Sequence, residues 1–281
     1  MSPWYYLIVL IEVPALLALA YAGGWWLYLL IAFVALMGMG ELYSALITRN
    51  IRPEAAVGYL CALLLMAAAQ FPPAAMRAEL MVLCLFLAVA APLAAQFTRT
   101  GEPDRLRDAA LTTLGVVYIA LPLCFVFMLC DMDIAKLVTG ETAGSLRARI
   151  GALLMVAAAV WLSDTAAWWI GKRYGRTKFT PRLSPNKTLE GALAGALTAV
   201  LATVIVGAWA GLPVMHGTIL GVVLAVAGQI GDLAESVIKR DLKLRDFGTL
   251  LGPHGGMLDT FDGMLFAAPV AWFYLWLFLM P

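Results

Sequence analysis

Nine apolar runs, each close to the length needed to cross a lipid bilayer, constrain this chain more than any other feature. A membrane-spanning helix needs about 20 mainly apolar residues. The chain is 63% hydrophobic and only 13% charged, and its mean hydropathy is +0.88. A soluble protein of 281 residues cannot bury that much apolar surface. We therefore predict an all-α, polytopic integral membrane protein with about nine transmembrane helices, at residues 4–21, 25–47, 55–70, 79–97, 109–129, 150–170, 189–210, 215–238 and 263–280.

The pattern indicates one membrane domain over residues 1–281, with no evident strand, tandem repeat or low-complexity stretch. Residues 1–148 supply N-terminal helices, and residues 149–281 supply the helices and loops with candidate chemistry. The four Cys residues show no metal-binding spacing, and two His residues exclude a His-rich metal site. The net charge of +1 argues against nucleic-acid binding. The first apolar run lacks a basic flank and a cleavage site, so we expect it to be retained as a helix.

The distribution of Lys and Arg predicts the orientation, because cytoplasmic loops carry an excess of them. With the N-terminus inside, fifteen of the 19 Lys and Arg residues fall in inside loops. The outside loops hold Arg77, Lys136, Arg147 and Arg149. We expect the N-terminus in the cytoplasm, the C-terminus outside, and the inner (cell) membrane of a bacterium as the location.

Three segments with polar and charged residues then meet at the cytoplasmic face. The helix at 150–170 carries Asp164 near its inner end, and the following loop holds six basic residues. Along the helix at 215–238 and just beyond it, Gln229, Asp232, Ser236 and Lys239 recur at helical spacing on one face. The segment 236–262 adds further acids, bases, a His and a Gly-Gly step.

This combination of residue types favours phosphoryl or nucleotidyl transfer at a membrane surface. Carboxylates suit a hard divalent ion such as Mg²⁺, Lys and Arg neutralise phosphate charge, and Gly-rich backbone allows close approach. Each part also has a simpler explanation. Asp232 can be a structural acid paired with a base, the basic loop can be a topology signal, and His254 can be an ordinary loop residue. For Glu12 and Glu41, which are also embedded in apolar runs, a structural and a functional role are equally favoured.

The motifs in these segments resemble those of the phosphatidate cytidylyltransferase (CDP-diacylglycerol synthase) family. The upstream Ser-Pro-x-Lys-Thr-x-Glu-Gly motif is present at 184–191, and Gly-Asp-x-x-Glu-Ser is present at 231–236. The C-terminal pattern runs from Ser236 through Lys239-Arg240 and His254-Gly255-Gly256 to Asp259 and Asp262. The resemblance covers roughly the last 120 residues. Two positions depart from it: Arg245-Asp246 stands for Lys-Asp, and Thr260 stands where the family has Arg.

The resemblance implies transfer of CMP from CTP to phosphatidic acid, giving CDP-diacylglycerol and pyrophosphate in phospholipid biosynthesis. It implies Mg²⁺, with two ions, as cofactor, CTP and phosphatidic acid as substrates, and a homodimer as the assembly. The implied catalytic residues are Asp232, Asp259, Lys239, Arg240 and His254. The implied substrate-binding residues are Ser184, Lys187, Thr188, Glu190, Ser236, Lys243, Arg245, Gly255 and Gly256. The implied metal ligands are Asp232 and Asp259, with Asp246 and Asp262 as alternates.

Two alternatives stay open at this point. A CTP-dependent lipid-alcohol kinase would also need a metal–phosphate site at the membrane. A diverged non-catalytic or transport paralogue is the other alternative, suggested by Thr260 and by the number of helices.

Overall fold

The apolar runs form helices wherever the structure describes them. The computed structural model describes residues 18–99, 104–142, 144–181, 183–248 and 255–279. The first half comprises α2 (Gly24–Ile47), α3 (Ala55–Gln70), α4 (Ala74–Ala95), the 3₁₀ turn η1 (Gln96–Thr98), α5 (Arg105–Gly115), the π-helical turn η2 (Val116–Ala120), α6 (Leu121–Cys130) and α7 (Ile134–Thr139). The second half comprises α8 (Ser145–Tyr174), β1 (Lys178–Thr180), β2 (Ser184–Thr188), α9 (Leu189–Ala210), α10 (Val214–Asp241) and α11 (Met257–Leu279).

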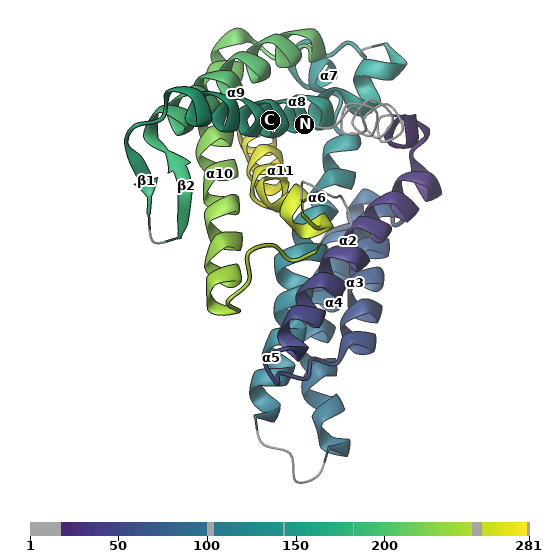
Figure 1. Cartoon of the computed structure of the whole chain (residues 1–281). Helices are drawn as coiled ribbons and strands as arrows, with labels where there is room; N and C mark the ends of the chain where they lie inside the picture. Colours follow the sequence, from purple (N-terminus) through teal and green to yellow (C-terminus); the bar gives the residue numbers. More distant parts are fainter. Residues whose placement is uncertain (1–17, 100–103, 143, 182, 249–254, 280–281) are drawn as a thin grey trace.

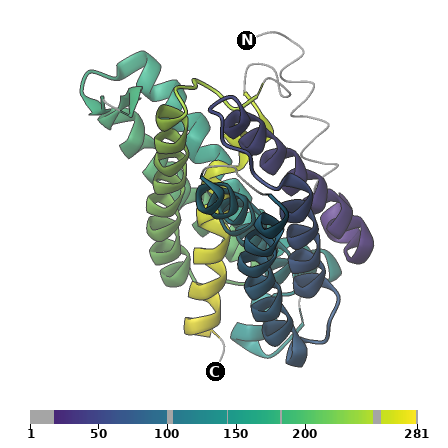
Figure 2. The ribbon, with the colours of Figure 1, turned by 90° about the horizontal axis from the view of Figure 1, so that it is seen from below.

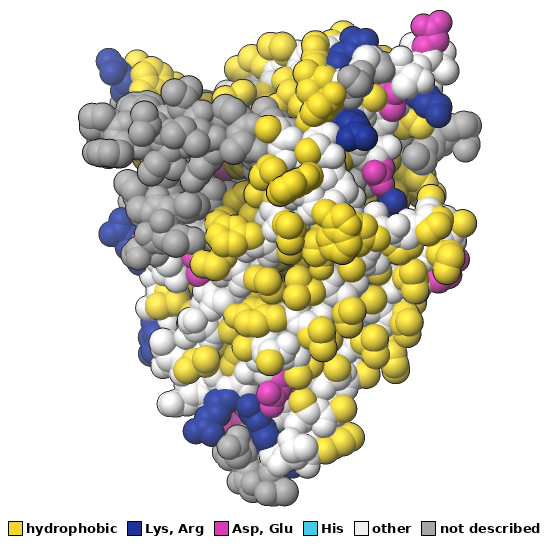
Figure 3. Space-filling view, turned by 90° about the vertical axis from the view of Figure 1, so that its right-hand side faces the viewer, with side chains coloured by type: hydrophobic (Ala, Val, Ile, Leu, Met, Phe, Trp, Pro, Cys, Tyr) yellow, Lys and Arg dark blue, Asp and Glu magenta, His cyan; other side chains and the backbone are white. Residues whose placement is uncertain are grey.

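The prediction of an all-α polytopic membrane protein is confirmed. Among the described residues, seven helical stretches are long and apolar enough to cross a membrane. The predicted number of nine is not confirmed, because α3 has only 16 residues and most of the predicted segment 4–21 lies outside the described residues. One side of the molecule is covered by hydrophobic side chains across its middle, with Lys and Arg toward the top, the base and the left edge of this view (Figure 3). The apolar middle suits contact with lipid.

The structure corrects the sequence prediction in two places. Residues 178–188 form a short antiparallel hairpin that the prediction lacked, with Lys178 paired to Thr188 and Thr180 to Ser184. Its strands are too short for alternation to be visible in the sequence. In addition, α11 begins at Met257, well before the predicted start at residue 263. The acidic residues in its first two turns lower the hydropathy there, so an apolar-run prediction begins too late.

Four helices of the second half hold the candidate site. In Figure 1, α8 lies across the top, α10 descends beside the hairpin, and a loop leads from α10 to α11. Helix α9 packs on α8 and α10, and α10 also packs on α11 (Figure 2). Gly231 lies at a close contact between α10 and α11. A Cβ atom there would stand 2.5 Å from the backbone oxygen of Asp262 and 3.1 Å from the ring of Phe266. The absence of a side chain at Gly231 lets the two helices touch beside Asp232 and Asp262.

Gly231→Ala tests this contact. We expect a lower melting temperature in detergent and a loss of about 1–3 kcal/mol in the free energy of unfolding, because a methyl group overpacks the contact. The matched control is Gly228→Ala on the same helix, where an added Cβ meets nothing within 4 Å. Equal melting temperatures for the two variants would contradict the assignment.

Candidate functional site

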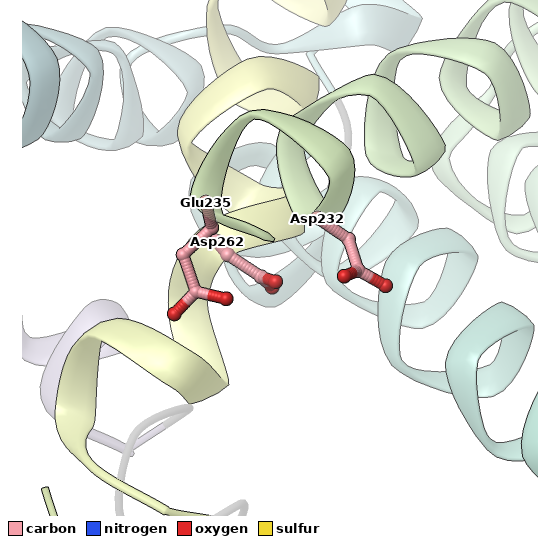
Figure 4. A group of neighbouring side chains, drawn as sticks. All are labelled: Asp232, Glu235 and Asp262. Carbon is pink, nitrogen blue, oxygen red and sulfur yellow. The ribbon is translucent and has the colours of Figure 1, made fainter. Parts of the chain in front are cut away.

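Three carboxylates from α10 and α11 form the centre of the candidate site. Asp232 and Glu235 lie one turn apart on α10, and Asp262 lies in the second turn of α11. One oxygen from each lies within 4.8 Å of the others, and the three side chains project toward the same region (Figure 4). Glu235 and Asp262 are buried, whereas Asp232 is half-buried. This oxygen-only set matches the ligands that a hard divalent cation prefers.

Lys239 neutralises the deepest part of this cluster. Its ammonium group forms ion pairs with Glu235, one turn earlier on α10, and with Oδ1 of Asp259, at 2.8 Å. The Glu235 carboxylate is buried, and this ion pair is its main compensation. A buried carboxylate without such a partner is strongly unfavourable. Lys239 therefore serves the stability of the site as well as its charge.

Asp259 connects α11 to the loop before it. Its Oδ2 accepts hydrogen bonds from the backbone N–H groups of Phe247 (2.9 Å) and Gly256 (2.7 Å). With Oδ1 paired to Lys239, both oxygens of Asp259 are engaged. Gly255 has a φ of +85°, and a Cβ there would collide with the Asp259 carboxylate. The Gly-Gly step thus lets the loop fold around Asp259, and the N–H of Gly256 is directed to that carboxylate.

The hairpin brings Lys187 to the open side of the cluster, where it forms an ion pair with Asp232. Local hydrogen bonds fix the hairpin where it joins α9. Thr188 caps α9 by accepting the N–H of Gly191 at 3.2 Å. Glu190 accepts the N–H of Thr177 with both oxygens, at 3.1 and 3.2 Å. Through these contacts Thr188 and Glu190 hold the end of the strand that presents Lys187.

The remaining predicted cations lie at the end of α10 and in the loop that follows it. Arg240 donates from Nε to the carbonyl of Leu183 (2.9 Å) and from Nη1 to that of Leu244 (3.1 Å), which ties the hairpin to this loop. Lys243 has a φ of 51° and is exposed. The exposed Arg245 lies beside Asp246, with 3.6 Å between Nε and Oδ2. Lys243 and Arg245 are thus accessible to an anionic ligand.

The structure brings most of the predicted residues to one end of the helices. Asp232 and Asp262 meet in the carboxylate cluster and Asp259 adjoins it, but Asp246 is exposed in the loop. Ser236 is buried on α10, and Ser184 is half-buried at the start of β2. Thr260 donates its hydroxyl to the carbonyl of Gly256 at 3.0 Å. His254 lies outside the described residues.

Two residues of the site were missed as ligands or supports. Glu235 belongs to the Gly-Asp-x-x-Glu-Ser motif, and its i,i+3 spacing from Asp232 could have identified it. Glu41 was noted only as an embedded acid. It binds backbone N–H groups of Met257 and Leu258, and such partners leave no side-chain signature in the sequence.

Comparison with known proteins identifies the family of the chain. The sequence profile of the cytidylyltransferase family matches residues 5–278. The chain is 39% identical over 121 residues to a protein of Bacillus subtilis (strain 168) named phosphatidate cytidylyltransferase, covering 42% of this chain and 45% of that protein. A protein of Brucella suis with the same name is 40% identical over 130 residues (46% and 48%), and one of Aquifex aeolicus is 37% identical over 125 residues (44% and 46%). The chain thus spans about half the length of the curated relatives it matches.

Lys239→Met tests the charge balance of the cluster. We expect it to cost about 3–5 kcal/mol of stability, because it leaves two buried carboxylates without their cation. Lys178→Met, which removes an exposed Lys on β1, is the matched control and should leave the melting temperature unchanged. Adding Glu235→Gln to Lys239→Met should restore part of the loss. A double variant no more stable than Lys239→Met would argue against charge as the cause.

Proposed function

The chain belongs to the cytidylyltransferase family, and from this membership we propose that it is a nucleotidyltransferase that moves CMP from CTP to phosphatidic acid. The products are CDP-diacylglycerol and pyrophosphate, and the reaction serves phospholipid biosynthesis. The observation that carries the proposal is the meeting of Asp232, Glu235 and Asp262 next to Lys187 and Lys239. The name of the matched relatives supports the choice of substrates.

Mg²⁺ is the proposed cofactor, and the residues present fit it. Asp232, Glu235 and Asp262 would hold the ion, since one oxygen from each lies within 4.8 Å of the others. The bound ion would neutralise charge on the phosphates of CTP. The second ion expected from the sequence would draw on Asp259, whose two oxygens are already engaged, so this geometry fits one ion more readily than two.

The protein's cations would bind and orient the two anionic substrates. Lys187, beside Asp232, is placed to bind phosphate oxygens at the open side of the cluster. Lys243 and Arg245 would bind the triphosphate or the lipid phosphate from the loop. An oxygen of the lipid phosphate attacks the α-phosphorus of CTP. As the new P–O bond forms, the bond to the β-phosphate oxygen breaks, and pyrophosphate leaves with that electron pair. The nucleophile is already an anion, so no general base is required.

The same proposal places the site at the cytoplasmic face of a bacterial inner membrane. The excess of Lys and Arg in the loops at this end supports that orientation. Loops predicted to share that face also contact one another. Arg49, after α2, donates to the carbonyl of Leu242, and Arg240 donates to that of Leu183. The expected homodimer stays a prediction.

The decisive experiment uses purified protein in lipid nanodiscs with phosphatidic acid, Mg²⁺ and CTP labelled at the α-phosphate. We expect the label to enter the lipid fraction while pyrophosphate is released, and EDTA to stop both. A lipid-alcohol kinase would instead leave the label in free CDP when a lipid alcohol is supplied. A folded protein that labels no lipid would overturn the proposal.

Asp262→Asn should abolish the transfer while preserving the fold. We expect turnover to fall by about 100-fold or more, the scale of losing one preorganised electrostatic group. Asp246→Asn, at an exposed position beside Arg245, is the control and should retain most of the turnover. If Asp246→Asn is inactive and Asp262→Asn is active, the ligand assignment is wrong.

A further inference from the structure

Glu41 joins the N-terminal half of the chain to the helix that carries two of the site's acids. It lies on α2, and its Oε1 accepts the N–H of Met257 at 2.8 Å while its Oε2 accepts the N–H of Leu258 at 2.9 Å. Both bonds fall in the first turn of α11. Each bond connects residues more than 200 positions apart in the sequence.

These bonds complete a helix start that has no side-chain cap of its own. The first N–H groups of a helix have no partner within it, and the positive end of its dipole favours an anion. Gly256, just before α11, has no side chain to accept them. Glu41 supplies acceptors for Met257 and Leu258, and Asp259 accepts the N–H of Gly256. With these three donors engaged, the N–H groups of Gly256, Met257 and Leu258 are occupied by carboxylates of the protein itself.

The surrounding backbone is shaped to receive the Glu41 carboxylate. A Cβ atom on Gly248 would stand 2.6 Å from Oε1 of Glu41, and one on Gly256 would overlap both carboxylate oxygens. Arg49, two turns further along, donates to the carbonyl of Leu242 at 2.8 Å from Nε and 2.5 Å from Nη2. The end of α2 and the residues after it thus hold the α10–α11 connection at both ends, at Leu242 and at Met257–Leu258.

We propose that Glu41 is a positioning residue for the transfer reaction. By fixing the first turn of α11, it sets the direction in which Asp262 reaches the carboxylate cluster and Asp259 reaches Lys239. Asp259 follows directly after Leu258, and Asp262 lies one turn beyond Leu258, so neither can be placed independently of it. In this role Glu41 acts through α11 and not by contact with substrate or with the proposed metal ion. This inference rests on the proposed function for its catalytic part, but not for the anchoring itself.

The test compares Glu41→Gln with Glu54→Gln. Glu54 is also a partly buried acid of the N-terminal half, paired with Arg99 at 2.8 Å, and among the described residues it forms no hydrogen bond or ion pair with α11. Glu54→Gln therefore reports a loss of stability that is unrelated to the site. Hydrogen–deuterium exchange of peptides spanning residues 255–262 gives a readout that does not depend on activity. We expect faster exchange at the start of α11 in Glu41→Gln and unchanged exchange there in Glu54→Gln.

The kinetic arm uses the labelled-lipid assay on the folded fraction of each variant. We expect Glu41→Gln to lower kcat by about 10- to 100-fold, as is typical when a residue that supports a metal ligand is lost. The Mg²⁺ concentration for half-maximal activity should rise, and the KM for CTP should stay unchanged. Glu54→Gln should leave all three as in the wild type.

The anchoring, the positioning role and the proposed function are each overturned by a different result. Unchanged exchange at residues 255–262 in Glu41→Gln would overturn the anchoring. Faster exchange with unaltered kcat and Mg²⁺ dependence would overturn the positioning role. A wild-type protein that labels no lipid would overturn the proposed function, and the exchange comparison would still decide the anchoring. Should Glu41→Gln fail to fold, Gly256→Ala, which crowds the same carboxylate from the other side, gives the same comparison.

Discussion

The site depends on burying several carboxylates side by side without unfolding the helices that carry them. Asp232, Glu235, Asp259 and Asp262 gather at the junction of α10 and α11, and two ammonium groups lie among them. Lys239 forms ion pairs with Glu235 and Asp259, and Lys187, on the hairpin, forms an ion pair with Asp232. When all four acids are ionised, two negative charges remain in excess. A low-dielectric site with such an excess is unfavourable alone and attracts a cation of matching charge.

The geometry divides the acids into two groups. Asp232, Glu235 and Asp262 present oxygens to a common region. The oxygens of Asp259 instead pair with Lys239 and accept hydrogen bonds from two backbone N–H groups. Asp259 therefore has the contacts of a residue that shapes the site, and the other three have the arrangement of ligands. The basic residues divide in the same way. Arg240 holds two loops together through carbonyls, while Lys243 and Arg245 stay exposed.

Much of this was predictable from the sequence, for physical reasons. Apolar length fixes where membrane helices form, and the excess of Lys and Arg indicates which loops share a face, so the gathering of residues around 187, 232 and 259 could be predicted. The hairpin could not, because its strands of three and five residues are too short to show a period. The start of α11 was misplaced because its acids look like loop residues until their partners are known. Glu41 could be recognised as unusual, but its partners are backbone groups, which every residue possesses.

The family motifs lie in the second half of the chain, yet the first half completes their geometry. Helix α2 contributes the anion at the start of α11, and Arg49 holds the end of α10. This has a consequence for how such proteins can be recombined. A chimaera that joins the motif-bearing half of one family member to the N-terminal half of another inherits every signature residue, but it inherits the helix start only if the new α2 presents a carboxylate at the position of Glu41. Sequence signatures alone therefore do not define the exchangeable unit of this protein.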